Sequence, residues 1–350
     1  MAVCALPAAL AMASPLKASA SSAPRALRPD VSPPPPLPHA WNSTILVGTH
    51  HKTGTVLLAK VFRVAARLME VPRSKENKTS SSGACAELFH TRSAGVCIEE
   101  HTSERTTATW LTEGTPFLHV VRDPLEMCVS AYQYHLQGTE PWLTLPRAEL
   151  GGKTLQSWYV ERSEREGVAF ECTRIMNELV DEALVFNATR GREATLSLFF
   201  EDFSANYDRE MRRIFDFLDS GDRAAALVKL ASQYDLARHS AGDERHVSAS
   251  EGKQRLRDLL YANPLLKEIL TALRVLLGYS NEPWMGRDTL CASLCQLCAT
   301  THVGFISWCA KGRVMKGKLT SLSECGEPAS FRGSAPQANH SRKSVGVQRL

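Results

Sequence analysis

The sequence lacks an uninterrupted apolar run of the roughly 20 residues that a bilayer-spanning helix needs, which predicts a chain without a transmembrane segment. It also lacks a strong net charge: 41 Lys and Arg against 37 Asp and Glu give +4 over 350 residues. So small an excess does not favour nucleic acid as a partner, although a local basic site for an anionic ligand is compatible with it. A hydrophobic share of 43% and a charged share of 22% are typical of a globular protein.

Acidic residues are absent from residues 1–29, which contain three basic residues and much alanine and serine. This composition resembles an organellar transit peptide. It predicts residues 1–40 as a targeting leader that ends in a proline-rich linker, with a plastid among the destinations. Two alternatives stay open, a cytosolic tail in the cytoplasm and a secretory signal that leads to the lumen of the secretory pathway. The second is favoured by four N-x-[ST] sequons, at Asn42, Asn77, Asn187 and Asn339.

The ten cysteines do not have the spacing of a disulfide framework, which belongs to short secreted chains. We expect the four in the middle of the chain to pack as thiols in the core; they are Cys85, Cys97, Cys128 and Cys172. The string "CASLCQLC" has the C-x3-C-x2-C spacing of the iron–sulfur motif of radical-SAM enzymes, but only 52 residues follow Cys298, too few for their barrel. A zinc site with Cys309 or His302, disulfides, packed thiols and a disordered tail stay open. Residues 286–350 are predicted to form an irregular tail.

Short β-rich runs alternate with helical segments from residue 44 onwards. After the spacer "VSPPPPLPHA", the pattern predicts strands at residues 44–48, 95–100, 117–121 and 195–200. Amphipathic or capped segments predict helices at residues 55–70, 124–136, 208–218, 251–261 and 263–279. Such alternation is typical of an α/β fold in which helices flank a central, mostly parallel sheet. The sequence has no internal repeat, so we assign one domain to residues 41–285.

The stretch "ILVGTHHKTGTVLLAK" places a lysine between a predicted strand and a predicted helix. The N–H groups at the start of a helix bind anions, and Lys52 adds a positive charge to them. The nucleotide-binding loop G-x-x-x-x-G-K-[ST] requires its lysine after the second glycine. Here Gly54 is followed by Thr55 and Val56, so that motif is not met. The third predicted strand ends in Arg122 instead of the acid that a magnesium nucleotide requires.

A second motif, "VVRDPLEMCVSAYQYH", follows the third predicted strand. It places Arg122 at the end of a strand, Pro124 in the first turn of a helix and Ser130 two turns further along that helix. A guanidinium and a hydroxyl at this spacing can converge on one phosphate group. The two motifs together predict two anion-binding positions at one edge of the sheet.

Together these motifs resemble those of sulfotransferases that use 3'-phosphoadenylyl sulfate (PAPS), over about residues 45–279. The resemblance implies a P-loop-like three-layer fold and transfer of the sulfuryl group of PAPS to a hydroxyl or amine of a small-molecule or glycan acceptor. Adenosine 3',5'-bisphosphate (PAP) is released, and no metal is required. The acceptor pocket would be lined by residues 136–168. The residues that would contact the cofactor are His51, Lys52, Thr53, Gly54, Thr55, Val56, Arg122, Ser130 and Lys253. Arg255 and Arg257 are alternatives to Lys253, because the late basic motif of the family is unclear in this sequence.

The chemistry also requires a base that takes the proton of the acceptor. The resemblance places it directly after the second predicted strand, where His101 stands and where Glu100 or Glu99 is the alternative. An imidazole has an ordinary pKa of about 6.5, which suits proton transfer near neutral pH. Lys52 would stabilise the leaving phosphate. A metal site formed by the adjacent His50 and His51 with His101 is disfavoured, because neighbouring side chains of an extended segment point in opposite directions.

Two other functions remain compatible with the sequence. One is an ATP-dependent P-loop kinase of small molecules, and the other is a catalytically inactive protein that binds a nucleotide or a partner on the same fold. The short dimerisation motif of the sulfotransferases is absent, so the sequence leaves the oligomeric state open.

Overall fold

Five parallel strands form one sheet with the order β2-β3-β1-β4-β5 in the computed structural model. The strands are β1 (Thr44–Thr49), β2 (Arg73–Glu76), β3 (Gly95–Glu100), β4 (Phe117–Val121) and β5 (Thr195–Phe199). The structure describes residues 35–37, 39–76, 84–111, 114–138, 140–235, 252–286, 289–290, 292–294 and 296–297. The central strand β1 is buried along its whole length, as expected of a parallel strand covered on both faces.

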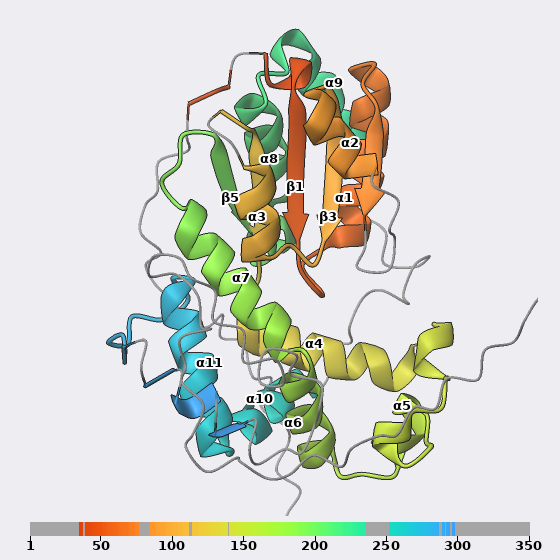
Figure 1. Cartoon of the computed structure of the whole chain (residues 1–350), viewed down its shortest axis with the longest axis vertical. Coiled ribbons are helices and arrows are strands. Elements are labelled where there is room, and N and C mark those ends of the chain that lie inside the picture. Colours follow the sequence, from red (N-terminus) through yellow and green to blue (C-terminus); the bar gives the residue numbers. More distant parts are fainter. Residues whose placement is uncertain are drawn as a thin grey trace, which may run out of the picture.

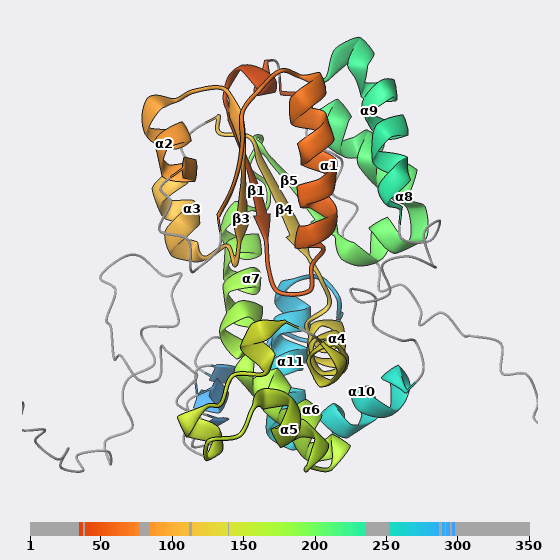
Figure 2. The same cartoon turned by 90° about the vertical axis from the view of Figure 1, so that its right-hand side faces the viewer.

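Helices cover both faces of the sheet (Figure 2). One face carries α1 (Thr55–Leu68), α8 (Phe200–Phe217) and α9 (Ala224–Ala231), and the other carries α2 (Ala84–Thr91) and α3 (Glu104–Trp110). The apolar side of α1 packs Leu58, Val61 and Phe62 into the core against β1 and β3. The predicted three-layer α/β fold is therefore confirmed, and every described strand pair is parallel.

A second group of helices lies beyond the carboxyl ends of the strands, where β1 points in Figure 1. It contains α4 (Pro124–Gln137), α5 (Leu155–Val160), α6 (Glu164–Arg174), α10 (Lys253–Tyr261) and α11 (Pro264–Leu276). Helix α7 (Met176–Thr189) connects it to the sheet, because it packs on α3 and β4 as well as on α6 and α11. Short 3-10 turns complete the fold at Ala40–Asn42, Pro141–Leu143, Ala148–Leu150, Gly221–Arg223 and Ser232–Tyr234. The site motifs therefore lie between the sheet and this helical group.

The predicted strands and helices are found close to their expected positions, except that the helix predicted at residues 208–218 begins earlier, as α8 (Phe200–Phe217), with a kink at Asn206. Pro124 occupies the first turn of α4, and the Asp123 carboxylate caps that helix by accepting a hydrogen bond from the Leu125 N–H. The edge strand β2 was not predicted because its sequence, RSKE, contains no apolar residue. The leader up to residue 34 and residues 298–350 of the tail lie outside the described residues, so the predictions for these segments stay predictions. At the start of the predicted irregular tail, the described residues 289–290, 292–294 and 296–297 are helical and bury Leu290, Leu294 and Leu297 in the core, which corrects that prediction for this part.

Two disulfides correct the prediction that the central cysteines are thiols. Cys85 is bonded to Cys97 and links α2 to β3, whereas Cys128 is bonded to Cys172 and links α4 to α6. All four side chains are buried, as expected. The prediction failed because the spacing along the chain does not show which helices and strands become neighbours. In the folded chain the paired cysteines have Cα–Cα distances of 5.3 and 4.6 Å, which lie within the range that a disulfide requires.

Among the helices that the structure describes, none is both long enough and apolar enough to cross a membrane.

Candidate active site

The connection between β1 and α1 is a tight loop held by its own threonines. The Thr53 hydroxyl accepts a hydrogen bond from the His50 N–H at 2.8 Å and donates one to the His50 carbonyl at 2.9 Å. The Thr55 hydroxyl donates to the Thr49 hydroxyl at 2.9 Å. Gly54 has a φ of 94°, a conformation that L side chains rarely adopt. These contacts fix the loop but use the hydroxyls of Thr53 and Thr55. The Thr53 N–H is used as well, because it donates to the His50 carbonyl at 3.2 Å, so an anion contact from these two residues would come mainly from the Thr55 N–H.

The first turn of α1 receives no hydrogen bond from a capping side chain. Its N–H groups, including that of Val56, lie at the positive end of the helix dipole. The side chain of Val56 is exposed and offers no polar contact. An uncapped helix start of this kind is suited to an anion, and the anion site expected here stays a prediction.

Lys52 lies beside this helix start. Its ammonium nitrogen sits 3.6 Å from the centroid of the Tyr134 ring, which belongs to α4. Burial, and next the positive charge of Arg122, lower the pKa of Lys52 to about 8. The ammonium group is thus charged at neutral pH but is held in a place where an added negative charge would be favourable.

Arg122 and Ser130 converge as their spacing predicted. The Arg122 guanidinium donates to the Ser130 hydroxyl at 3.3 Å and to the Lys52 carbonyl at 2.7 Å, and it stacks on the Phe200 ring at 4.5 Å. Lys253 stands at the start of α10, where burial and then the charge of Arg122 lower its pKa. Lys52, Arg122 and Lys253 therefore share one electrostatic neighbourhood.

The two alternatives to Lys253 are already paired with acids. Arg255 contacts Glu164 at 2.6 Å and Arg257 contacts Glu126 at 2.5 Å. Lys253 has no ion pair among the residues that the structure describes. Of the three basic residues of this segment, it is the one best placed for an anionic ligand.

His101 directly follows β3 and has a left-handed backbone, with φ 68°. Its Nδ1 lies 2.7 Å from a carboxylate oxygen of Glu178, a residue of α7 that the sequence motifs did not indicate. A carboxylate at Nδ1 orients an imidazole and leaves Nε2 as the group available to a ligand. Glu99 and Glu100 end β3 beside His101, and both are half-buried. The position predicted for the base thus holds an oriented histidine.

The adjacent histidines of the loop diverge, as the sequence argument required. His50 turns into the core, where its Nε2 lies 2.8 Å from Nε2 of His119 on β4. His51 turns to the other side, and its ring stacks at 6.5 Å on the ring of His101. His50 therefore forms no common metal site with His51 and His101.

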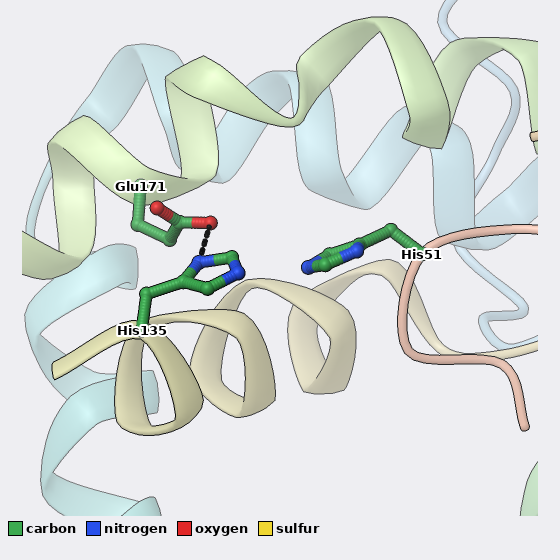
Figure 3. Close-up of side chains that lie close together, drawn as sticks. All are labelled: His51, His135 and Glu171. Carbon is green, nitrogen blue, oxygen red and sulfur yellow. Dashed lines mark hydrogen bonds and ion pairs between the residues drawn. The ribbon is translucent and has the colours of Figure 1, made fainter. Parts of the chain in front are cut away.

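His51 instead faces a residue pair that the sequence analysis missed, His135 of α4 and Glu171 of α6 (Figure 3). The rings of His51 and His135 lie 5.0 Å apart. One candidate ligand atom from each of the three residues lies within 4.8 Å of the others. His135 is the last residue of the quoted motif "VVRDPLEMCVSAYQYH", so the motif contained it. No sequence signal pairs it with Glu171, 36 positions later.

No protein-family model matches the chain, and no curated protein matches it in sequence. Among solved structures, the fold of this chain is similar to the crystal structure of the mouse sulfotransferase SULT7A1 complexed with PAP. The identity is 16%, the TM-score is 0.39, and the match covers 69% of this chain and 86% of the mouse protein. So distant a likeness carries no information on the activity or ligands of this chain.

Proposed function

We propose that this protein is a PAPS-dependent sulfotransferase. The proposal is supported by two groups of residues at one edge of the sheet that are suited to anions: the uncapped start of α1 with Lys52, and the hydrogen-bonded pair of Arg122 and Ser130. PAPS has two matching anionic groups, a 5'-phosphosulfate and a 3'-phosphate. Lys253 adds a third positive charge to the same neighbourhood.

In the proposed reaction, an oxygen or nitrogen atom of the acceptor attacks the sulfur atom of PAPS. The bond between sulfur and the bridging phosphate oxygen breaks, and PAP leaves with the electron pair of that bond. Lys52 neutralises the charge that develops on the leaving phosphate. His101, oriented by Glu178, takes the proton of the acceptor through Nε2. Neither a metal ion nor a redox step is needed for this balance.

Calorimetric titration tests the nucleotide. We expect the protein to bind PAP without magnesium and to prefer it to ATP. Preference for magnesium-ATP would instead support the small-molecule kinase. Screening an acceptor library with sulfur-labelled PAPS then tests turnover: Lys52→Ala should abolish it, whereas Lys229→Ala, on the remote and exposed part of α9, should not. PAP binding without turnover of any acceptor would support the inactive nucleotide-binding protein.

The two disulfides bear on the compartment. Stable disulfides persist in oxidising compartments and are rare where glutathione keeps thiols reduced. Two of the four sequons lie on described residues, and both of their asparagines, Asn42 and Asn187, are exposed. We therefore infer the lumen of the secretory pathway in preference to the plastid. A glycosidase-sensitive mass on the protein from its native source would support this, and a chloroplast location of a full-length fluorescent fusion would contradict it.

A further inference from the structure

Two buried imidazole nitrogens face each other beside Lys52. Nε2 of His51 and Nε2 of His135 are each buried, and neither has a hydrogen-bond partner among the described residues. Figure 3 shows the two rings pointing toward one another across a gap. Buried polar atoms are almost always hydrogen-bonded in folded proteins, so a facing pair without partners indicates a place for a polar group from outside the chain.

The tautomer of His135 is fixed by its surroundings. Nδ1 of His135 lies 2.9 Å from a carboxylate oxygen of Glu171 and 3.2 Å from Nη2 of Arg174. That Arg174 nitrogen makes its shorter bond, 2.7 Å, to the Glu171 carboxylate, so we assign the carboxylate as the partner of His135 Nδ1. Arg174 donates to both oxygens of this carboxylate, at 2.7 and 2.9 Å, and the Tyr159 hydroxyl donates to one of them. Burial alone would raise the pKa of Glu171, but Arg174 and His135 hold it well below its usual range. An ionised carboxylate only accepts hydrogen bonds, so His135 carries its proton on Nδ1 and presents a lone pair at Nε2.

A metal ion fits this cluster poorly. Both oxygens of Glu171 are already engaged by Arg174, His135 and Tyr159. Two imidazoles would remain as ligands, fewer than the three protein ligands of typical catalytic zinc sites. The charges of Arg174 and Lys52 also act on His51, where they disfavour an added positive charge.

A hydroxyl group fits the same cluster well, because it donates one hydrogen bond and accepts others. We propose that His51 and His135 bind a hydroxyl of the acceptor: the hydroxyl donates to Nε2 of His135 and accepts from the N–H at Nε2 of His51. Glu171 is then a positioning residue that sets the direction of the His135 lone pair.

This pair is separate from the histidine to which the proposed reaction assigns the proton transfer. His101 is held by its own carboxylate, Glu178, and its ring centroid lies 6.5 Å from that of His51, against 5.0 Å for His135. One acceptor would contact both sites if it carried a second hydroxyl near the reacting one. This extension rests on the proposed function, and it assigns the acceptor to alcohols with two or more neighbouring hydroxyls.

The test uses the full-length protein labelled with ¹⁵N in its histidines and saturated with PAP. The probes are cyclohexanol, the cyclohexane-1,2-diols and myo-inositol, and ring ¹⁵N chemical shifts are the readout. We expect His135 to be in the Nδ1–H form. The diols and inositol should shift the Nε2 resonances of His51 and His135, and cyclohexanol should do so much less.

Variants identify the atoms. His135→Asn keeps a donor for Glu171 but removes Nε2, and it should weaken binding of the responding probe about tenfold while PAP affinity stays unchanged. His51→Asn should act similarly, and His51→Gln, which keeps a polar group near Nε2, should recover most of the binding. His90→Asn, on the exposed side of α2, is the matched control.

Two outcomes would overturn the inference: no hydroxylated probe shifts either histidine, or ZnCl₂ alone shifts both and His135→Asn removes that response. A large loss of kcat in His135→Asn, together with disappearance of the acidic limb of the pH–rate profile where the base is protonated, would overturn the separation from His101 and make His135 the base. Failure of PAP to bind in the calorimetric titration is a failure of the proposed function. The same probes are also titrated against the protein without PAP, so the histidine responses are measured in either case and the two failures are distinguishable.

Discussion

The disulfide between Cys128 and Cys172 is buried between two helices that carry residues of the candidate site. It joins α4 to α6 and closes a loop with a sequence separation of 44. Cys128 stands two positions before Ser130, and Cys172 directly follows Glu171. The bond therefore ties the helix that carries Ser130 and His135 to the helix that carries Glu171. We predict that removing it costs stability and loosens the contact between His135 and Glu171.

The loop length sets the size of the effect. In the chain-entropy description, a loop of 44 residues gives about 4 kcal/mol at 25 °C, and the loop of 12 residues closed by Cys85 and Cys97 gives about 3 kcal/mol. For a domain of this size, each 1 kcal/mol changes the melting temperature by about 2–4 °C. Loss of the longer cross-link should therefore lower the melting temperature by roughly 8–16 °C.

The assay is denaturant unfolding of the double variant Cys128→Ala/Cys172→Ala without reductant. The double variant Cys85→Ala/Cys97→Ala is the matched control, because it also removes two buried sulfur atoms. Both variants lose similar packing, so the difference between their unfolding free energies, about 1 kcal/mol, reports the difference in loop length.

Two results would refute this reasoning. Peptide mapping of the unreduced protein that finds Cys128 or Cys172 alkylated would show that the bond is absent. A loss below about 1 kcal/mol in Cys128→Ala/Cys172→Ala would show that the cross-link does not constrain the unfolded chain as its loop length requires.

The remaining predictions concern the site itself. Because the pKa of Lys52 is lowered to about 8, its positive charge is present at pH 7 and is lost as the pH rises through 8. PAP affinity measured by calorimetry should therefore fall between pH 7 and 9.5. An affinity that does not change with pH would contradict a contact between the Lys52 ammonium group and PAP. Ser130→Ala should weaken PAP binding about tenfold but leave binding of adenosine 5'-phosphate unchanged, since only PAP has a 3'-phosphate; equal losses for both nucleotides would contradict this assignment. If His101 is the base, His101→Asn should lower kcat about 10²–10⁴-fold, and Glu178→Gln should lower it less because the imidazole is kept; steady-state kinetics of the two variants checks the order, and an unchanged kcat in His101→Asn would exclude it as the base.

Local patterns were enough for much of the sheet and for the positions of the residues that we propose to bind the nucleotide. Arg122 and Ser130 lie eight positions apart on one strand end and one helix, so helical periodicity alone predicts that they converge. Lys52 and Gly54 lie within one loop, whose ends are fixed by a strand and a helix. In each case the residues that must meet are neighbours along the chain, and secondary structure decides their geometry.

Partners from distant segments could not be predicted in this way. Glu178 contacts His101 from 77 positions away, and Glu171 contacts His135 from 36 positions away. These contacts form because α7 packs on α3, which follows His101, and α6 packs on α4, which carries His135. The same packing brings Cys128 to Cys172. The sequence by itself determined the α/β alternation and the local geometry of the two proposed anion-binding motifs, since these depend on local periodicity. Only the tertiary structure decided which carboxylate orients each histidine and which cysteines are bonded, because helix packing brings together residues that no local pattern connects.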